Sequence, residues 1–280
     1  MKLIADCGST KIDWCLIENQ KVVKQVFTCG MNAVMLTEEE MTTRIANELM
    51  PEMKDYVGQI AEVHFYGAGC ISPDVCANVA NAIRANIPAG EINVATDLLA
   101  AARALCGHEA GIACIMGTGS NSCYYDGTEI RDNVSPLGYI LGDEGSGAVL
   151  GKILLGDVLK NQLPADLCQK FLKEFDLDRL TIIKRVYKEP QANRFLASVT
   201  PFLIQNIDRV EVYSLVLNAF KAFFVRNIQQ YENYDKLSVN FIGSIAFYYR
   251  DVLSQAAREC GCTVGNIIKS PMEGLIRFHA

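Results

Sequence analysis

Two short turns carry most of the residues in this chain that could do chemistry. Residues 6–11 (Asp-Cys-Gly-Ser-Thr-Lys) follow one apolar run, and residues 117–120 (Gly-Thr-Gly-Ser) interrupt another. Glycine lets the backbone approach an anion closely, and hydroxyl and backbone N–H groups donate hydrogen bonds to phosphate oxygens. The carboxylate of Asp6 could hold Mg²⁺ directly or through water. Both turns predict phosphate binding, although each alone also fits an ordinary hairpin.

Three further positions place glycine or polar residues directly before or at the start of a predicted helix. Asp97 lies between a strand and an alanine-rich helix, where a carboxylate either caps the helix or acts as a general base. The acidic residues of segment 142–146 precede another helix, as caps or as ligands to a polar substrate. Gly243 and Ser244 end an apolar strand at a helix N-terminus, a backbone site that could meet a nucleotide.

The elements that must position these residues occur as a repeat. Residues 2–21 and 111–126 each begin as an apolar strand, pass through a Gly/Ser/Thr turn and return as a second strand. Because turn chemistry, hydroxyl pattern and flanking strands agree, we interpret them as a duplication. This interpretation predicts two lobes, residues 1–109 and 110–280, with one hairpin facing the other across a cleft.

Strands and helices alternate after each hairpin. In the first half we expect helices over 38–53, 73–86 and 98–105, with Thr37 as an N-cap, and strands over 62–66 and 92–95. In the second half, helices over 148–159, 165–187 and 193–231, with breaks near Asp176 and Pro201, precede strands over 239–242 and 263–268. Antiparallel strands followed by strand–helix alternation predict a mixed sheet in each lobe.

Composition excludes several classes of function. The 280 residues are 50% hydrophobic, with a net charge of −6 and a pI near 5.2, which argues against nucleic acid as a partner. No apolar stretch approaches the roughly 18 residues of a membrane span, and Asp6 interrupts the first apolar run. We therefore expect no membrane partner and a cytoplasmic location. The 11 cysteines are scattered, which predicts reduced thiols.

The common nucleotide and hydrolase motifs are absent. The segment around Gly151 and Lys152 lacks the glycine spacing and the Ser/Thr of a P-loop. No Gly-x-Gly-x-x-Gly follows a strand, and no Gly-x-Ser-x-Gly elbow has triad partners. Phosphate binding by hairpin turns is the alternative that remains.

Together these motifs resemble the BadF/BadG/BcrA/BcrD ATPase family of the actin/hexokinase/Hsp70-like superfamily, and within it the N-acetylglucosamine kinase branch. The resemblance spans nearly the whole chain, and its specific part is the pairing of Gly-Thr-Gly-Ser-Asn at 117–121 with Gly-Asp-Glu-Gly-Ser at 142–146. It implies an α/β, two-lobed actin-like (ribonuclease H-like) ATPase fold with duplicated mixed sheets flanked by helices. It also implies ATP and Mg²⁺ as cofactors.

The resemblance implies a role for each matching residue. Asp97 would be the catalytic base in transfer of the γ-phosphoryl group to a sugar hydroxyl, expected to be the 6-hydroxyl of N-acetylglucosamine or a related amino sugar. Asp6 would hold the metal ion. Nucleotide-binding residues would be Gly8, Ser9, Thr10, Lys11, Gly117, Thr118, Gly119, Gly243 and Ser244, and sugar-binding residues would be Asn32, Asp97, Ser120, Asn121, Gly138 and Asp143.

The chain also departs from the family pattern. The glycine-tryptophan-glycine sugar segment reads Pro136-Leu137-Gly138, and the glycine-rich motif near the C-terminus reads Met272-Glu-Gly274. The cysteine-rich zinc motif of the ROK sugar kinases is missing, which argues against that neighbouring group. These departures leave the identity of the sugar open.

Two other functions remain alternatives. Some members of the family are ATPases that activate an iron–sulfur dehydratase, and here Cys70 and Cys106 are conceivable cluster ligands at a dimer interface. A nucleotide- or sugar-sensing module without turnover is the third hypothesis. The expected partners are therefore a sugar and ATP, and a homodimer is left open.

Overall fold

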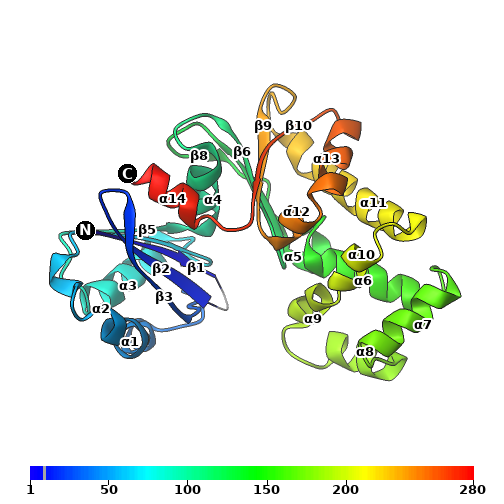
Figure 1. Ribbon diagram of the computed structural model, residues 1–280, viewed down its shortest axis with the longest axis horizontal. Helices are drawn as coiled ribbons and strands as arrows, with labels where there is room; N and C mark the ends of the chain where they lie inside the picture. Colours follow the sequence, from blue (N-terminus) through cyan, green and yellow to red (C-terminus); the bar gives the residue numbers. More distant parts are fainter. Residues whose placement is uncertain (9–10) are drawn as a thin grey trace. The chain divides into compact units, whose positions relative to one another are not determined.

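The computed structural model describes residues 1–8 and 11–280, which form two compact units (Figure 1). Unit 1 consists of Met1–Glu109, Gly127–Glu129 and Ser270–Ala280, and unit 2 of Ala110–Asp126 and Ile130–Lys269. The expected division put residues 270–280 into the second lobe, whereas they pack in unit 1. The reason is the C-terminal helix α14 (Met272–Phe278), which packs on α4 (Asp97–Cys106).

Unit 1 is built on a five-stranded mixed sheet in the order β3-β2-β1-β4-β5. Strands β1, β2 and β3 are antiparallel, and β1, β4 and β5 are parallel. The strands are β1 (Lys2–Cys7), β2 (Lys11–Glu18), β3 (Lys21–Cys29), β4 (Glu62–Gly67) and β5 (Glu91–Thr96).

Unit 2 repeats this topology with its own sheet, in the order β10-β9-β6-β7-β8. Strands β6, β7 and β8 are antiparallel, and β6, β9 and β10 are parallel. The strands are β6 (Gly111–Met116), β7 (Ser120–Tyr125), β8 (Ile130–Asp132), β9 (Ser238–Ile242) and β10 (Thr263–Ile268). The predicted duplication of a mixed sheet is thereby confirmed.

The two units differ in the helices inserted between their third and fourth strands. Unit 1 inserts α1 (Glu38–Arg44), the π-helical η1 (Ile45–Leu49), α2 (Met50–Met53) and η2 (Val57–Gln59). Unit 2 inserts α5 (Gly138–Leu141), α6 (Gly147–Leu159), α7 (Ala165–Glu174), α8 (Arg179–Tyr187), α9 (Ala192–Ser198), α10 (Pro201–Gln205), α11 (Val210–Arg226) and η3 (Ile228–Gln230). The crossovers after the fourth strands are α3 (Pro73–Arg84) in unit 1 and α12 (Ser244–Tyr248) with α13 (Arg250–Glu259) in unit 2.

Local sequence accounts for several element boundaries. Thr37 and Glu40 form the capping box that begins α1, as the Thr37 prediction required. The break predicted near Asp176 is confirmed: α7 ends at Glu174, and the φ of 48° at Asp176 does not fit a right-handed helix. In the part of the chain that the structure describes, no helix is long and apolar enough to cross a membrane.

The two faces of the unit 1 sheet have different roles. Leu3, Ala5 and Cys7 alternate onto one face and form a core with Trp14 and with residues of α1 and α3, such as Ile83. The other face carries the side chains at alternate positions, Asp6, Asp13 and Tyr66 among them, and α4 and α14 pack against the strands there. The polar residues of interest therefore lie between a sheet and two helices.

Helix α14 packs on α4 at backbone distance. A Cβ atom added at Gly274 would lie 2.4 Å from the carbonyl oxygen of Ala104, which no real side chain tolerates. Gly274, at the segment that departs from the family's glycine-rich motif, is thus required by helix packing.

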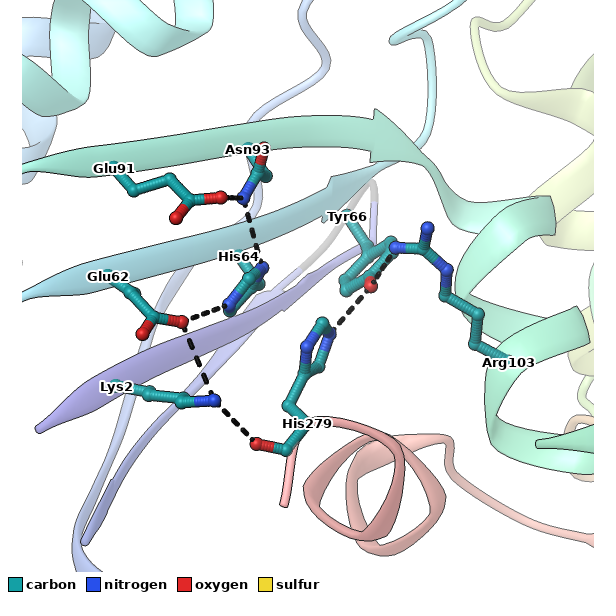
Figure 2. Close-up of polar contacts among 8 residues, drawn as sticks. All are labelled: Lys2, Glu62, His64, Tyr66, Glu91, Asn93, Arg103 and His279. Carbon is teal, nitrogen blue, oxygen red and sulfur yellow. Dashed lines mark hydrogen bonds and ion pairs between the residues drawn. The ribbon is translucent and has the colours of Figure 1, made fainter. Parts of the chain in front are cut away.

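The end of α14 is held by a polar network shown in Figure 2. The His279 ring stacks on His64, with centroids 3.8 Å apart, and its Nε2 lies 2.8 Å from the Tyr66 hydroxyl. Lys2 Nζ donates to the His279 carbonyl at 3.0 Å. Burial, together with the charges of His64, Arg103 and Lys2, lowers the pKa of His279 from 6.5 to about 3.

This burial makes the stability of the fold depend on pH. Below pH 6.5 His279 is protonated in the unfolded chain, whereas the native ring stays neutral, so the unfolded state binds more protons. The free energy of unfolding therefore decreases as the pH is lowered, by up to about 1.4 kcal/mol per pH unit. Chemical denaturation between pH 7 and 4.5 measures this slope. Buried carboxylates with raised pKa values act in the opposite direction. The contribution of His279 is therefore the slope of the wild type minus the slope of His279→Asn, whose side chain cannot titrate. Parallel curves for the two proteins would contradict a buried neutral His279.

Candidate active site

In unit 1 the three parallel strands end at the same edge of the sheet. Cys7, Gly67 and Thr96 are aligned across β1, β4 and β5, and Asp97 follows directly as the first residue of α4. Ligands of open α/β sheets bind beyond the carboxyl ends of such strands. The hairpin turn after β1 and the carboxylate of Asp97 are therefore at the edge where a ligand is expected.

Thr96, and not Asp97, caps α4. Its Oγ1 accepts a hydrogen bond from the Leu99 N–H at 3.1 Å, and its backbone is extended as an N-cap requires. Burial raises the pKa of the half-buried Asp97, and the Leu98 N–H acts in the opposite direction. The capping alternative is thus met by the preceding residue, which leaves the Asp97 carboxylate for another role.

Asp6 faces a second carboxylate across the hairpin. Asp13 is its direct partner on β2, is 9% exposed, and accepts a hydrogen bond from Gln25 Nε2 at 2.8 Å. The pKa of Asp6 rises to about 7, because of burial first and then the negative charges of Asp13 and Asp97, while Lys11 acts the other way. Sequence reasoning missed Asp13, although an acidic residue inside an otherwise apolar strand was a readable signal.

The pair of carboxylates fits a partly hydrated Mg²⁺ better than an enclosed metal centre. Over residues 1–8 and 11–280, no group of three or more His, Cys, Asp or Glu side chains could hold a metal ion. Mg²⁺ usually keeps several waters and takes one or two carboxylates together with substrate phosphates. Asp6 and Asp13 are oxygen donors of that kind.

The remaining phosphate-turn residues of unit 1 are partly described. The Gly8 N–H donates to the Lys11 carbonyl at 3.0 Å, which closes the turn. Lys11 is exposed, with Nζ 5.0 Å from the centroid of the Phe27 ring. The predicted ligands Ser9 and Thr10 lie outside the described residues.

Asn32 forms a turn beside the loop after β4. Its Oδ1 accepts a hydrogen bond from the Val34 N–H at 3.1 Å, as in an Asx-turn. A Cβ atom at Gly69 would lie 2.9 Å from the same oxygen, so the two loops are in contact. The Asn32 amide N–H₂ has no acceptor among the described residues.

In unit 2 the hairpin between β6 and β7 is held by the first turn of α6. The N–H groups of Gly147 and Ala148 donate to the carbonyls of Gly117 and Thr118, at 2.8 and 3.0 Å. The Thr118 side chain is exposed, and its hydroxyl has no partner within the described part of the chain. This geometry fixes the turn through its carbonyls and leaves the Thr118 hydroxyl for a ligand.

Gly243 lies against the same turn. A Cβ atom there would be 2.4 Å from the Met116 carbonyl oxygen, and its φ of 122° also requires glycine. The exposed Ser244 then begins α12. The structure thereby brings together two of the predicted nucleotide segments, the turn at Gly117–Gly119 and the end of β9.

Ser120 joins the hairpin to the loop that contains Asp143. Its N–H donates to Asp143 Oδ1 at 3.3 Å, and its Oγ donates to the Glu144 carbonyl at 2.9 Å. Ser120 is 6% exposed, so its hydroxyl is used inside the protein. Burial raises the pKa of Asp143, and the Ser120 N–H lowers it.

Two other predicted sugar residues lie apart from this pair. Asn121 follows Ser120 in β7, so its side chain lies on the opposite face of the sheet, where its Oδ1 accepts from Asn133 Nδ2 at 2.9 Å. Gly138 begins α5 with a φ of 73° and is exposed. The structure therefore unites Ser120 with Asp143 and does not unite them with Asn121.

Comparison with solved structures finds the same fold over the whole chain. A “putative N-acetylglucosamine kinase” from Porphyromonas gingivalis matches with a TM-score of 0.95 and 49% identity, over 100% of this chain and 98% of that chain. A protein of the same description from Chromobacterium violaceum matches with a TM-score of 0.78 and 16% identity, over 100% and 98%. A ROK family glucokinase from Streptomyces griseus, solved with glucose and AMPPNP, matches with a TM-score of 0.57 and 12% identity, over 99% and 97%.

No protein-family model and no curated protein matches the chain. The two sheets of equal topology, each flanked by helices, nevertheless define the two-lobed actin-like (ribonuclease H-like) ATPase fold, which confirms the predicted class. The Porphyromonas protein is 49% identical to this chain over nearly the full length of both, so the two proteins belong to one family. The chain belongs to the BadF/BadG/BcrA/BcrD ATPase family, in its N-acetylglucosamine kinase-like branch.

The exposed Thr118 hydroxyl allows a direct test of the hairpin. Thr118→Val keeps the volume of the side chain and deletes the hydroxyl that we expect to donate to a charged phosphate, a loss of about 1.5–3 kcal/mol. We expect ATP affinity to fall roughly tenfold to a hundredfold in calorimetry, with an unchanged melting temperature. Thr118→Ser, which keeps the hydroxyl, is the matched control. Equal affinities in wild type and Thr118→Val would remove Thr118 from the phosphate site.

Proposed function

We propose that this protein is an ATP-dependent sugar kinase whose acceptor is the 6-hydroxyl of N-acetylglucosamine or a related amino sugar. The observation that carries the proposal is the 49% identity, over the whole chain, to a protein described as a putative N-acetylglucosamine kinase. The glucokinase of the same fold, solved with glucose and an ATP analogue, supports a sugar and ATP as the substrate pair.

We assign the phosphates of ATP to the two hairpin turns. In unit 2 the assignment is supported by the free hydroxyl of Thr118 and by the proximity of Gly243 to Gly117. In unit 1 it extends to Gly8 and Lys11, and the roles of Ser9 and Thr10 rest on the family resemblance. Bound Mg²⁺ would neutralise charge on the phosphoryl oxygens, with Asp6 and Asp13 as the residues that hold it.

We assign the acceptor sugar to Asp97, Asn32 and Asp143. Asn32 offers an amide N–H₂ group, and Asp143 offers a carboxylate whose desolvation strengthens its hydrogen bonds. Gly138 presents backbone in an exposed segment. Ser120 acts by holding the Asp143 loop. Asn121 has the least support because its Oδ1 already accepts hydrogen bonds from Ser122 and Asn133.

The chemical step needs one proton acceptor. The half-buried Asp97 carboxylate accepts the proton of the sugar hydroxyl while that oxygen bonds to the γ-phosphorus and the bond to ADP breaks. Burial raises the pKa of Asp97, which makes its carboxylate a stronger base than an exposed aspartate. Because the Thr96 hydroxyl caps α4, Asp97 is available for this proton.

The dehydratase-activator alternative has less support. A cluster shared between two subunits needs thiols at the surface, and Cys70 is only 2% exposed. A cytoplasmic location is part of the kinase proposal.

Incubation with Mg·ATP and a panel of hexoses and amino sugars tests the proposal. We expect ADP release with N-acetylglucosamine or a related amino sugar, slower release with glucose, and a phosphomonoester at the 6-position by ³¹P and ¹H NMR. ADP release that does not depend on any sugar, in a brown protein purified without oxygen, would favour the dehydratase activator. Binding of ATP or sugar without ADP release would indicate a sensing module.

A further inference from the structure

We propose that Tyr66 is a positioning residue for Asp97, acting through helix α4 and the C-terminal helix α14. The inference rests on the proposed role of Asp97 as the base. It concerns the hydrogen-bond network of Figure 2, which none of the sequence motifs includes.

Tyr66 occupies the strand between the two carboxylates of interest. In the register of the parallel strands it is the partner of Asp6 on β1 and of Ala95 on β5, two residues before Asp97. Its side chain is 1% exposed and lies on the sheet face against which α4 and α14 pack. A buried hydroxyl at this position must find its partners within the protein.

The hydroxyl of Tyr66 joins α4 to the end of α14 through two hydrogen bonds, one accepted and one donated. Arg103 Nη1, on α4, donates to the Tyr66 oxygen at 2.8 Å. A guanidinium cannot accept, so the Tyr66 O–H is left to donate to His279 Nε2, also at 2.8 Å. His279 is therefore neutral with its proton on Nδ1, in agreement with the lowered pKa of this ring.

The partly buried guanidinium of Arg103 depends on the Tyr66 oxygen as its hydrogen-bond acceptor. Its guanidinium lies 4.9 Å from the Phe278 ring centroid and 5.8 Å from the Tyr66 centroid, and its Nε is buried with no acceptor among the described residues. No carboxylate in the described chain forms an ion pair with it. The Tyr66 oxygen is thus the acceptor that holds this cation in place.

The far side of the network is anchored to the sheet. The His279 ring stacks on His64 of β4, and Lys2 of β1 donates to the His279 carbonyl. Gly274 brings α14 to backbone contact with Ala104, the residue after Arg103. Helix α4 is therefore clamped near its C-terminal end by sheet and α14 together.

The clamp controls Asp97 because α4 is short and rigid. Arg103 lies six positions after Asp97, about 9 Å along a helix axis. Loss of the contacts at the C-terminal end lets α4 shift or tilt as a whole, which moves the Asp97 carboxylate. A misplacement of about 1 Å at a reacting group can cost on the order of 10²-fold in rate. Loss of the Tyr66 hydroxyl should therefore lower kcat with little effect on substrate binding.

Tyr66→Phe tests this inference in the full-length protein. The variant keeps the ring and deletes the hydroxyl, and we expect kcat to fall roughly tenfold or more while KM for ATP and for the sugar stays within about twofold. Tyr249→Phe is the matched control, because it also deletes one buried hydroxyl, which donates to the Thr200 carbonyl at 2.6 Å in unit 2. Both variants should lose similar thermal stability, but the control should keep kcat.

Wild-type kcat in Tyr66→Phe, or an equal fall of kcat in both variants, would overturn the inference. If Tyr66→Phe does not fold, His279→Leu removes the acceptor of the Tyr66 O–H and should give the same split between kcat and KM. Hydrogen exchange gives a readout independent of catalysis. Amides of α4 should exchange faster in Tyr66→Phe than in Tyr249→Phe. If this difference is seen but the wild type shows no sugar kinase activity, the proposed function fails while the role of Tyr66 in holding α4 is supported.

Discussion

The rest of the site depends on the electrostatic repulsion among the carboxylates at the carboxyl edge of the unit 1 sheet. Asp6 and Asp13 oppose each other across a hairpin, and Asp97 adds to the field that raises the pKa of Asp6 to about 7. Buried like charges are unfavourable unless a cation or a proton compensates them. These three carboxylates are the reason that we propose a Mg²⁺ site at this edge of the sheet.

The fold meets this demand with a sheet topology that is used twice. The parallel register of β1, β4 and β5 brings Cys7, Gly67 and Thr96 level, so that the hairpin turn and Asp97 share one edge. In unit 2 the equivalent hairpin meets the first turn of α6, which takes up the carbonyls of Gly117 and Thr118. The same backbone plan therefore supplies carboxylates in one unit and a rigid donor-rich turn in the other.

Local patterns were sufficient to predict the sheets, the duplication and many helix boundaries. Thr37 with Glu40 and the break at Asp176 depend only on neighbouring residues, and short-range chemistry is readable from sequence. The alternation of β7 also implies that Ser120 and Asn121 point to opposite faces, although the motif-based assignment placed both on the sugar.

The features that sequence reasoning missed depend on contacts between distant segments. Gly274 is required by the Ala104 carbonyl, 170 residues earlier in the chain, and this packing is why the last residues belong to unit 1. The Ser120 hydroxyl is used by Glu144, and Asp13 is significant only because the register places it opposite Asp6. No local pattern reports such pairings before the fold is known.

The central claim is that Asp97 takes the proton of the acceptor hydroxyl, and turnover of Asp97→Asn tests it most directly. Asparagine keeps the size of the side chain, and because Thr96 supplies the cap, the melting temperature should barely change. The account predicts that kcat falls roughly 10²–10⁴-fold while calorimetry still detects binding of ATP and sugar. A variant that keeps more than about a tenth of the wild-type kcat would contradict it, since a base that contributes less than about 1.4 kcal/mol does not carry the proton transfer.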